Sequence, residues 1–217
     1  MLGVDSLLPR PRAEIAPGAV HVPGWLDSPR QHQLVQACRD WARTGEMERV
    51  RLPGGGLLSV RTLCLGLRWR PYRYTGEPVQ PLPDWLAELG RTAVADTLGG
   101  SIDPDVALVN FYDDAAKMGM HQDRDERSAA PVVSLSLGDA CVFRFGNSQT
   151  RARPWRDVRL ESGDLFVFGG PSRRAFHGVC RILPGTGPQG LLKGRLNITL
   201  RESGQGLAHR PPRRAST

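Results

Sequence analysis

Hydrophobic residues recur at helical spacing in two stretches of the first half of the chain. Leu34, Cys38 and Trp41 are three or four residues apart, and Ser28 can cap the helix that they predict. A second apolar stripe predicts a helix over residues 82–98. Its members are Leu82, Trp85, Leu86, Leu89 and Ala93.

Short strands dominate the pattern from residue 105 onward. Seven apolar or alternating runs are separated by turn residues such as Gly138-Asp139 and Ser162-Gly163. The runs span residues 105–112, 131–137, 140–145, 156–161, 164–169, 175–181 and 194–201. Because two helices precede these strands, we expect a mainly β fold with flanking helices (α+β), in which a sandwich or barrel has the helices packed outside.

The length of 217 residues suits one domain. We expect a loose N-terminal arm over residues 1–14, a single domain over 15–202 and a disordered basic tail over 203–217. No apolar run approaches the roughly 20 residues that a membrane span needs. The N-terminus lacks the pattern of a secretory signal, and the four cysteines form no CxxC pair, so we expect a reduced cytoplasmic protein.

Arginine accounts for the basic charge of the chain. The formal net charge is +7, and 27 of the 29 basic residues are arginines. Such a surplus is compatible with a polyanionic partner such as nucleic acid. A GC-rich coding sequence would produce the same bias, so the charge alone does not identify a partner.

An HxD pair and a distant histidine are the first candidates for chemistry. His121 and Asp123 lie two residues apart, so both side chains can lie on one side of an extended segment, and His177 follows 56 residues later. Two imidazoles and one carboxylate are the facial triad that holds Fe(II) and leaves three positions open. On this motif alone, a surface loop with a histidine beside acidic neighbours is the simpler interpretation.

The last predicted strand strengthens the case for a site. Its apolar side holds Leu196, Ile198 and Leu200, and its polar side holds Arg195, Asn197, Thr199 and Arg201. The polar side could face water. Alternatively it could face a cavity, where two guanidinium groups grip a dicarboxylate from both ends.

Two polar residues on another strand extend the candidate cavity. Asn110 and Tyr112 share a face and follow the apolar residues 106–109. If they are buried they need hydrogen-bond partners, which either the backbone of the core or a carboxylate ligand could provide.

Taken in order, these motifs resemble those of the AlkB family, the Fe(II)- and 2-oxoglutarate-dependent dioxygenases that remove alkyl groups from nucleic-acid bases. The resemblance covers residues 15–202 and includes further segments. These are Pro53-Gly54-Gly55, residues 130–138, Phe143-x-Phe145-Gly146 and Gly163-Asp164. The ordered set is far more specific than any single motif.

The resemblance implies a double-stranded β-helix, or jelly roll, over about 105–202, with a nucleotide-recognition lid over about 50–76. It implies that Fe(II) is held by His121, Asp123 and His177. It also implies that the cosubstrate 2-oxoglutarate is bound at its distal carboxylate by Arg195, Asn197 and Tyr112. Arg201 and Asn110 would hold the end that chelates iron, and O₂ would be the oxidant.

The resemblance further implies direct-reversal repair of alkylated DNA, or RNA, at lesions such as 1-methyladenine and 3-methylcytosine, with release of formaldehyde and succinate. We expect a monomer that acts on single strands. Asp125 matches a position near the flipped base, although a solvated acid paired with an arginine is the alternative. The candidates for stacking on the base are Trp69, Tyr72 and Tyr74.

The chain differs from the family pattern in its lid. Gly56-Leu57 stands where a close relative has an aromatic residue, and the lid is shortened between Trp69 and Tyr72. These differences concern substrate preference and leave the iron chemistry unchanged. Two alternatives remain open from the sequence. One is a dioxygenase of the same fold that hydroxylates a protein or a small molecule, and the other is a non-catalytic jelly roll that binds nucleic acid.

Overall fold

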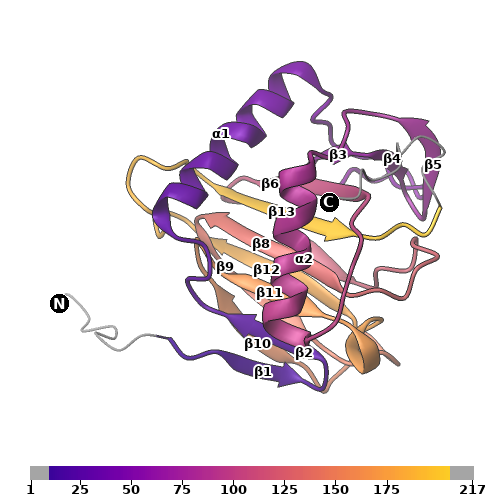
Figure 1. Ribbon diagram of the computed structural model, residues 1–217, viewed down its shortest axis with the longest axis vertical. Helices are drawn as coiled ribbons and strands as arrows, with labels where there is room; N and C mark the ends of the chain where they lie inside the picture. Colours follow the sequence, from indigo (N-terminus) through magenta and orange to yellow (C-terminus); the bar gives the residue numbers. More distant parts are fainter. Residues whose placement is uncertain (1–9, 206–217) are drawn as a thin grey trace, which may run out of the picture.

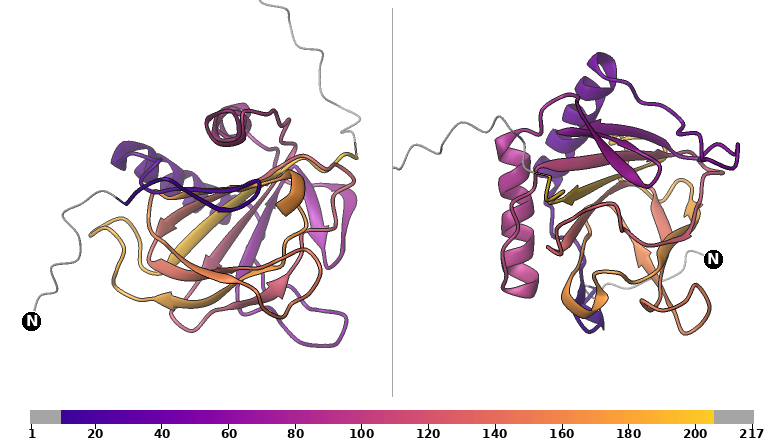
Figure 2. Two further views of the ribbon diagram at one scale, coloured as in Figure 1. Left: turned by 90° about the horizontal axis from the view of Figure 1, so that it is seen from below. Right: turned by 90° about the vertical axis from the view of Figure 1, so that its right-hand side faces the viewer.

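Two β-sheets lie face to face in the computed structural model, which describes residues 10–205 (Figures 1 and 2). The larger sheet has seven strands in the order β1-β2-β11-β8-β13-β6-β3. Their bounds are β1 Ala13–Ala16, β2 Ala19–Val22, β3 Arg61–Leu65, β6 Val106–Tyr112, β8 Val132–Gly138, β11 Leu165–Phe168 and β13 Arg195–Arg201. All the pairings in this sheet are antiparallel, as in the predicted jelly roll.

The smaller sheet has four strands in the order β10-β9-β12-β7. Their bounds are β7 Met118–His121, β9 Ala140–Phe145, β10 Arg156–Leu160 and β12 His177–Leu183. A separate hairpin, β4 Leu67–Arg70 and β5 Arg73–Pro78, lies within the predicted lid. A short 3-10 helix, η1 Gly170–Ser172, precedes β12.

The helices α1 (Ser28–Thr44) and α2 (Asp84–Leu98) cover the outer face of the larger sheet, as predicted (Figure 1). Their apolar stripes bury Leu34, Cys38, Leu86 and Val94 against the outward side chains of β8 and β13. The N-cap of α1 is Asp27 and not Ser28, because the Asp27 carboxylate accepts a 2.8 Å hydrogen bond from the backbone of Arg30. Neither helix is both long and apolar enough to cross a bilayer.

Alternation along the strands of the larger sheet separates two cores. On β8, Val133 and Leu135 face the helices, whereas Val132 faces the smaller sheet. The core between the sheets is rich in aromatic rings. It includes Phe143, Phe145, Phe166 and Phe168. The same alternation sends polar side chains of β13 and β6 into the space between the sheets.

Residues 10–14 of the predicted N-terminal arm are held by the domain and are not loose. The Arg10 guanidinium binds both carboxylate oxygens of Asp164 at 2.7 Å, and Arg12 donates to two carbonyls at the end of α2. The strands β1 and β2, which sequence analysis did not predict, then extend the larger sheet beyond β11. Residues 1–9 of the arm lie outside the described residues.

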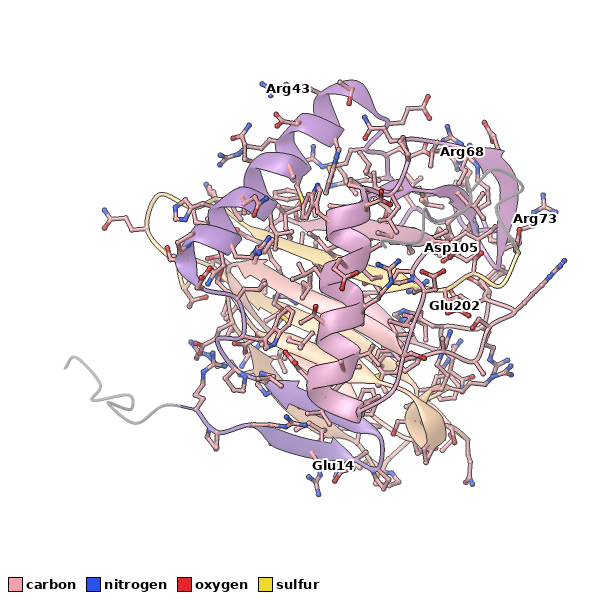
Figure 3. The ribbon with its side chains drawn as sticks, in the orientation of Figure 1. Glu14, Arg43, Arg68, Arg73, Asp105 and Glu202 are labelled. Atoms are coloured by element: carbon pink, nitrogen blue, oxygen red, sulfur yellow. The ribbon has the colours of Figure 1, made fainter. Side chains whose placement is uncertain are left out.

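The first residues of the predicted tail also belong to the domain. Asp105 and Glu202 lie near each other where β6 begins and β13 ends (Figure 3). Ser203 is buried, and its hydroxyl donates to the Asp105 carboxylate at 2.5 Å. The remainder of the predicted tail, residues 206–217, lies outside the described residues.

Asp164 joins the arm to the sheet and supports a prediction about acid stability. Burial disfavours its charged form, but hydrogen bonds from His21, Arg10 and two backbone amides outweigh burial and lower its pKa to about 2. We therefore expect Asp164→Asn to lower the free energy of unfolding by about 2 kcal/mol near neutral pH. The lowered pKa means that this stabilisation is complete above about pH 4 and is lost as the pH falls toward 2.

Urea unfolding at pH 7, 4 and 3 measures this dependence. The free energies of unfolding of wild type and Asp164→Asn should differ less as the pH falls. The control is Asp157→Asn, which breaks an exposed ion pair with Arg144 and should change the free energy of unfolding little at any pH. If the free energies of unfolding of wild type and Asp164→Asn differ by the same amount from pH 7 to pH 3, the lowered pKa of Asp164 is contradicted.

Candidate active site

His121, Asp123 and His177 come together between the two sheets. His121 ends β7 and His177 begins β12, and the antiparallel register places the two residues directly opposite each other. Their ring centroids are 4.5 Å apart. Asp123 follows β7 by two residues and is buried beside them. Strand pairing therefore unites residues that are 56 positions apart in the sequence.

The three side chains present converging donor atoms. The Nε2 atom of His121 lies 3.7 Å from Asp123 Oδ1, and that of His177 lies 3.8 Å from Asp123 Oδ2. Each histidine donates from Nδ1 to a backbone carbonyl at 2.9 Å, His121 to Gly119 and His177 to Ala175. Because Nδ1 carries the hydrogen, the lone pair of Nε2 is free for a metal ion. One atom from each residue lies within 4.8 Å of the others, so the set could hold one cation.

The local charges favour the protonation states that metal ligands need. Burial opposes ionisation of Asp123, but Arg201, His177 and His121 outweigh burial and lower its pKa to about 2. Burial and the neighbouring His121 lower the pKa of His177 to about 4, although Asp123 acts in the opposite direction. At neutral pH the site therefore holds an ionised carboxylate and a neutral imidazole.

The polar side of β13 faces this cavity and not water. All seven residues of β13 are buried, and its four polar side chains line the same cavity as the His–Asp–His group. Across the ladder, Arg195 is paired with Tyr112, and Asn197 with Asn110, so β6 adds both predicted residues to the cavity wall. The interpretation of β13 as a solvent-facing strand is thus wrong.

Arg195 lies at one end of this polar side with unused hydrogen-bond donors. The side chain is 1% exposed, and Nη2 donates to Ser136 Oγ at 3.0 Å. Its Nε and Nη1 are buried and have no partner among residues 10–205. An unpaired buried guanidinium nitrogen is costly, and a bound carboxylate would provide the missing acceptors. The residues present therefore fit an anionic cosubstrate.

Two neighbours of Arg195, Asn197 and Tyr112, line the same end of the cavity. The Asn197 amide donates to Ser134 Oγ at 2.8 Å and to the Leu135 carbonyl at 3.1 Å, which fixes its orientation. Burial raises the pKa of Tyr112, so its hydroxyl keeps its proton and can donate.

Arg201 lies at the other end of β13, beside the candidate metal ligands. Its Nη2 is 2.8 Å from Asp123 Oδ2, and its Nη1 donates to Glu126 Oε1 at 3.1 Å. Its Nε is buried without a partner in the described part of the chain. Asn110 Oδ1 accepts a 2.7 Å hydrogen bond from Thr62, which leaves the Asn110 amide nitrogen as a donor toward the cavity.

The lid hairpin contacts the acidic residues that follow Asp123. Trp69 and Tyr74 are cross-strand partners on β4 and β5. The Trp69 indole donates to Asp125 Oδ2 at 2.7 Å, and the Tyr74 hydroxyl donates to Glu126 Oε1 at 3.0 Å. Asp125 is half-buried and, among the described residues, has an indole and not an arginine as its hydrogen-bond partner.

The three aromatic residues of the lid differ in how far their side chains are exposed for stacking on a base. Tyr74 is 5% exposed, so its ring presents no open face for stacking in this structure. Tyr72 is 71% exposed at the hairpin turn, with a φ of 72°, and Trp69 is partly buried beside Asp125. Trp69 is therefore the candidate that both contacts the site and keeps part of its side chain exposed.

Sequence analysis missed two charged residues of the site. Glu126 belongs to an acidic and basic run that has the pattern of a solvated loop, yet it is buried. Arg173 is also buried and donates to the Glu126 carboxylate at 3.0 Å. No local pattern identifies either residue, because their partners lie 43 or more positions away in the sequence.

Comparisons with known proteins agree with this geometry. The sequence profile of the 2OG-Fe(II) oxygenase superfamily matches residues 18–201. The "Alpha-ketoglutarate-dependent dioxygenase AlkB homolog" of Caulobacter vibrioides is 42% identical over 201 residues, which cover 87% of this chain and 89% of the relative. The "DNA N(6)-methyladenine demethylase ALKBH1D" of Arabidopsis thaliana is 34% identical over 86% of this chain and 50% of its own length.

A solved structure has the same fold. "The structure of OsALKBH1" superposes with a TM-score of 0.80 at 32% identity and covers 88% of this chain and 100% of that chain. The chain therefore belongs to the AlkB family of the 2OG-Fe(II) oxygenase superfamily and is a dioxygenase that depends on Fe(II), 2-oxoglutarate and O₂.

Proposed function

We propose that this enzyme removes alkyl groups oxidatively from nucleic-acid bases, with Fe(II) held by His121, Asp123 and His177. The observation that carries the proposal is Arg195, a buried guanidinium with two unpartnered nitrogens in the cavity that contains the three ligands. A relative from Arabidopsis thaliana whose name gives it DNA demethylase activity supports nucleic acid as the substrate class.

The polar residues of β13 and β6 bind opposite ends of the cosubstrate. Arg195, with Asn197 and Tyr112, binds the distal carboxylate of 2-oxoglutarate, and Arg201 with Asn110 orients the end nearest Asp123. Bound Fe(II) supplies the chemistry by which O₂ and 2-oxoglutarate hydroxylate an alkyl carbon, so that succinate, CO₂, formaldehyde and the restored base are the overall products. The buried wall of the cavity keeps bulk water from the reacting groups.

Trp69 and Asp125 together recognise the base. The indole holds the Asp125 carboxylate at 2.7 Å, and the same ring can stack on a base that has left its helix. Lesions such as 1-methyladenine and 3-methylcytosine carry a positive charge and an amino group, both of which a carboxylate favours. Because a base in a single strand costs less to extrude, unpaired strands are the preferred substrate.

The described residues of one chain form the cavity and bring the three proposed ligands together, so the proposed enzyme acts as a monomer. The direct test of the function is mass spectrometry of a panel of alkylated DNA and RNA oligonucleotides, single- and double-stranded, after incubation with enzyme, Fe(II) and 2-oxoglutarate. Loss of an alkyl group with matching succinate supports the proposal. Succinate formation with every oligonucleotide left unchanged would direct the search to protein or small-molecule substrates.

His177→Ala should abolish turnover, because a facial triad has no spare ligand. We expect a loss of at least about 100-fold in succinate formation and a matching loss of Fe(II) affinity, since even outer-shell changes cost about 10–100-fold. Circular dichroism checks that the fold survives, and His32→Ala, on the exposed side of α1, is the control. Unchanged metal affinity in His177→Ala would remove this residue from the site.

Arg195→Lys should raise the KM for 2-oxoglutarate by about tenfold or more, although the charge is kept. A guanidinium makes a planar two-point contact with a carboxylate, which an ammonium group cannot reproduce. Arg91→Lys, which alters an exposed ion pair on α2, serves as the matched control. The same KM in wild type and Arg195→Lys would rule out Arg195 as the carboxylate-binding residue.

Asp125→Ala should lower turnover of cationic lesions more than that of neutral ones such as 1-methylguanine. A charge-assisted hydrogen bond contributes about 1.5–3 kcal/mol, so we expect a selective loss of about tenfold or more. Trp69→Phe keeps an aromatic ring but loses the indole N–H, and should shift selectivity in the same direction by less. Turnover is measured in parallel on cationic and neutral lesions, and Asp114→Ala, which changes an exposed acid, is the control. Equal losses of turnover on both lesion classes would contradict recognition of the base by Asp125.

A further inference from the structure

Arg173 is a buried arginine that the proposed chemistry does not use. It follows η1 and precedes His177 by four residues, and its relative exposure is 8%. A guanidinium is rarely buried unless its charge is compensated and its donors are used. The hydrogen bonds of Arg173 therefore indicate its role in the structure.

Within residues 10–205, the hydrogen bonds of the Arg173 guanidinium all go to one loop. Its Nη1 donates to the Asp123 carbonyl at 2.8 Å, and its Nε donates to the Ala130 carbonyl at 2.7 Å. Its Nη2 donates to Glu126 Oε2 at 3.0 Å. The three acceptors lie in residues 122–131, which join β7 to β8 and have no strand ladder of their own. One planar group thus holds three points of the loop that carries Asp123.

The backbone of Asp123 depends on this contact. Within residues 10–205, no other hydrogen bond to the Asp123 carbonyl is seen. The loop has further anchors, which are the Gln122 amide on the carbonyls of Ser148 and Arg174, the lid contacts to Asp125 and Glu126, the amide of Arg127 on the Ser203 carbonyl and the Ser128 hydroxyl on Glu202. None of these hydrogen bonds is made to the backbone of Asp123 itself. Arg173 therefore links the carboxylate ligand directly to the segment that leads into His177.

Glu126 extends the link to the cosubstrate side of the cavity. Its carboxylate is fully buried and binds Arg173 through Oε2 and Arg201 through Oε1. Arg201 in turn lies 2.8 Å from Asp123 Oδ2. Asp123, Glu126, Arg173 and Arg201 thus form a buried cluster of two negative and two positive charges. Such a cluster is tolerated because each charge has an opposite neighbour.

We propose that Arg173 is a positioning residue of the metal centre, which fixes the Asp123 carboxylate relative to His177 by holding residues 123–130. This inference rests on the proposed function only in its assignment of the metal ligands. Lysine cannot replace Arg173, because a single ammonium group cannot reach three acceptors in the geometry of a guanidinium. Groups that orient metal ligands typically affect metal affinity about 10–100-fold when they are changed.

The test is a titration of the protein with Co(II) alone, as a spectroscopic substitute for Fe(II), together with thermal unfolding of the metal-free protein. Arg173→Lys should bind Co(II) about 10–100-fold more weakly than wild type. Arg10→Lys is the matched control, because it makes the same change at an arginine that binds another buried carboxylate, Asp164. The control should lower the unfolding temperature and leave Co(II) affinity unchanged.

A second variant separates positioning from the cost of an unpaired buried charge. Arg173→Gln combined with Glu126→Gln removes one positive and one negative charge together, so the protein should fold even if Arg173→Lys does not. We expect its Co(II) affinity to stay about tenfold or more below that of wild type. Wild-type affinity in either folded variant, or an equal loss of affinity in Arg10→Lys, would overturn the inference. A wild-type protein that binds no Co(II) or Fe(II) would instead refute the proposed metal site.

Discussion

The compensation of buried charge is the constraint on which the site depends. Asp123 must be ionised to hold a cation, yet it lies in the interior between two sheets. A buried carboxylate without opposite charge would be neutral or would destabilise the fold. Arg201, whose Nη2 lies 2.8 Å from Asp123 Oδ2, provides that compensation, and Arg173 and Glu126 hold the surrounding loop in place. The network that surrounds Asp123 is therefore larger than the three proposed metal ligands.

Strand β13 shows how a regular element provides two environments at once. Its apolar residues support the helices, whereas its polar residues line the cavity. Because the period of a strand is two, a register slip of one residue would place the cavity residues in the apolar core. Pairing with β6 on one side and β8 on the other holds the register over the whole strand. The stability of the outer core and the geometry of the cosubstrate site are thus linked through one strand.

The lid is connected to the same interior. Its hairpin contacts Asp125 through Trp69 and Glu126 through Tyr74, and these acids lie two and three residues after Asp123. Glu126 also binds Arg201, so the lid, the cosubstrate side of the cavity and the metal side share one buried carboxylate. The regions proposed for base recognition and for cosubstrate binding are therefore neighbours in space and share a hydrogen-bonded network.

The sequence by itself determined the parts of this protein that follow from local periodicity. The two helical stripes, seven of the strands and the division of residues 195–201 into apolar and polar sides agree with the structure, because each depends on the spacing of neighbouring residues. The order of the motifs also gave the family. Local pattern could not decide whether the polar side of β13 faces water or a cavity, since alternation is the same in both cases.

Only the tertiary structure decided which charges are buried and what they contact. Glu126 lies in a sequence with the pattern of a solvated loop, and Arg173 has no local feature that distinguishes it from the other arginines. Their burial depends on partners that are 43 or more positions away, brought together by the pairing of β7 with β12 and of β13 with β6 and β8. The same holds for Arg10 and Asp164, which are 154 positions apart. Long-range strand pairing determines these contacts, and no short stretch of sequence encodes it.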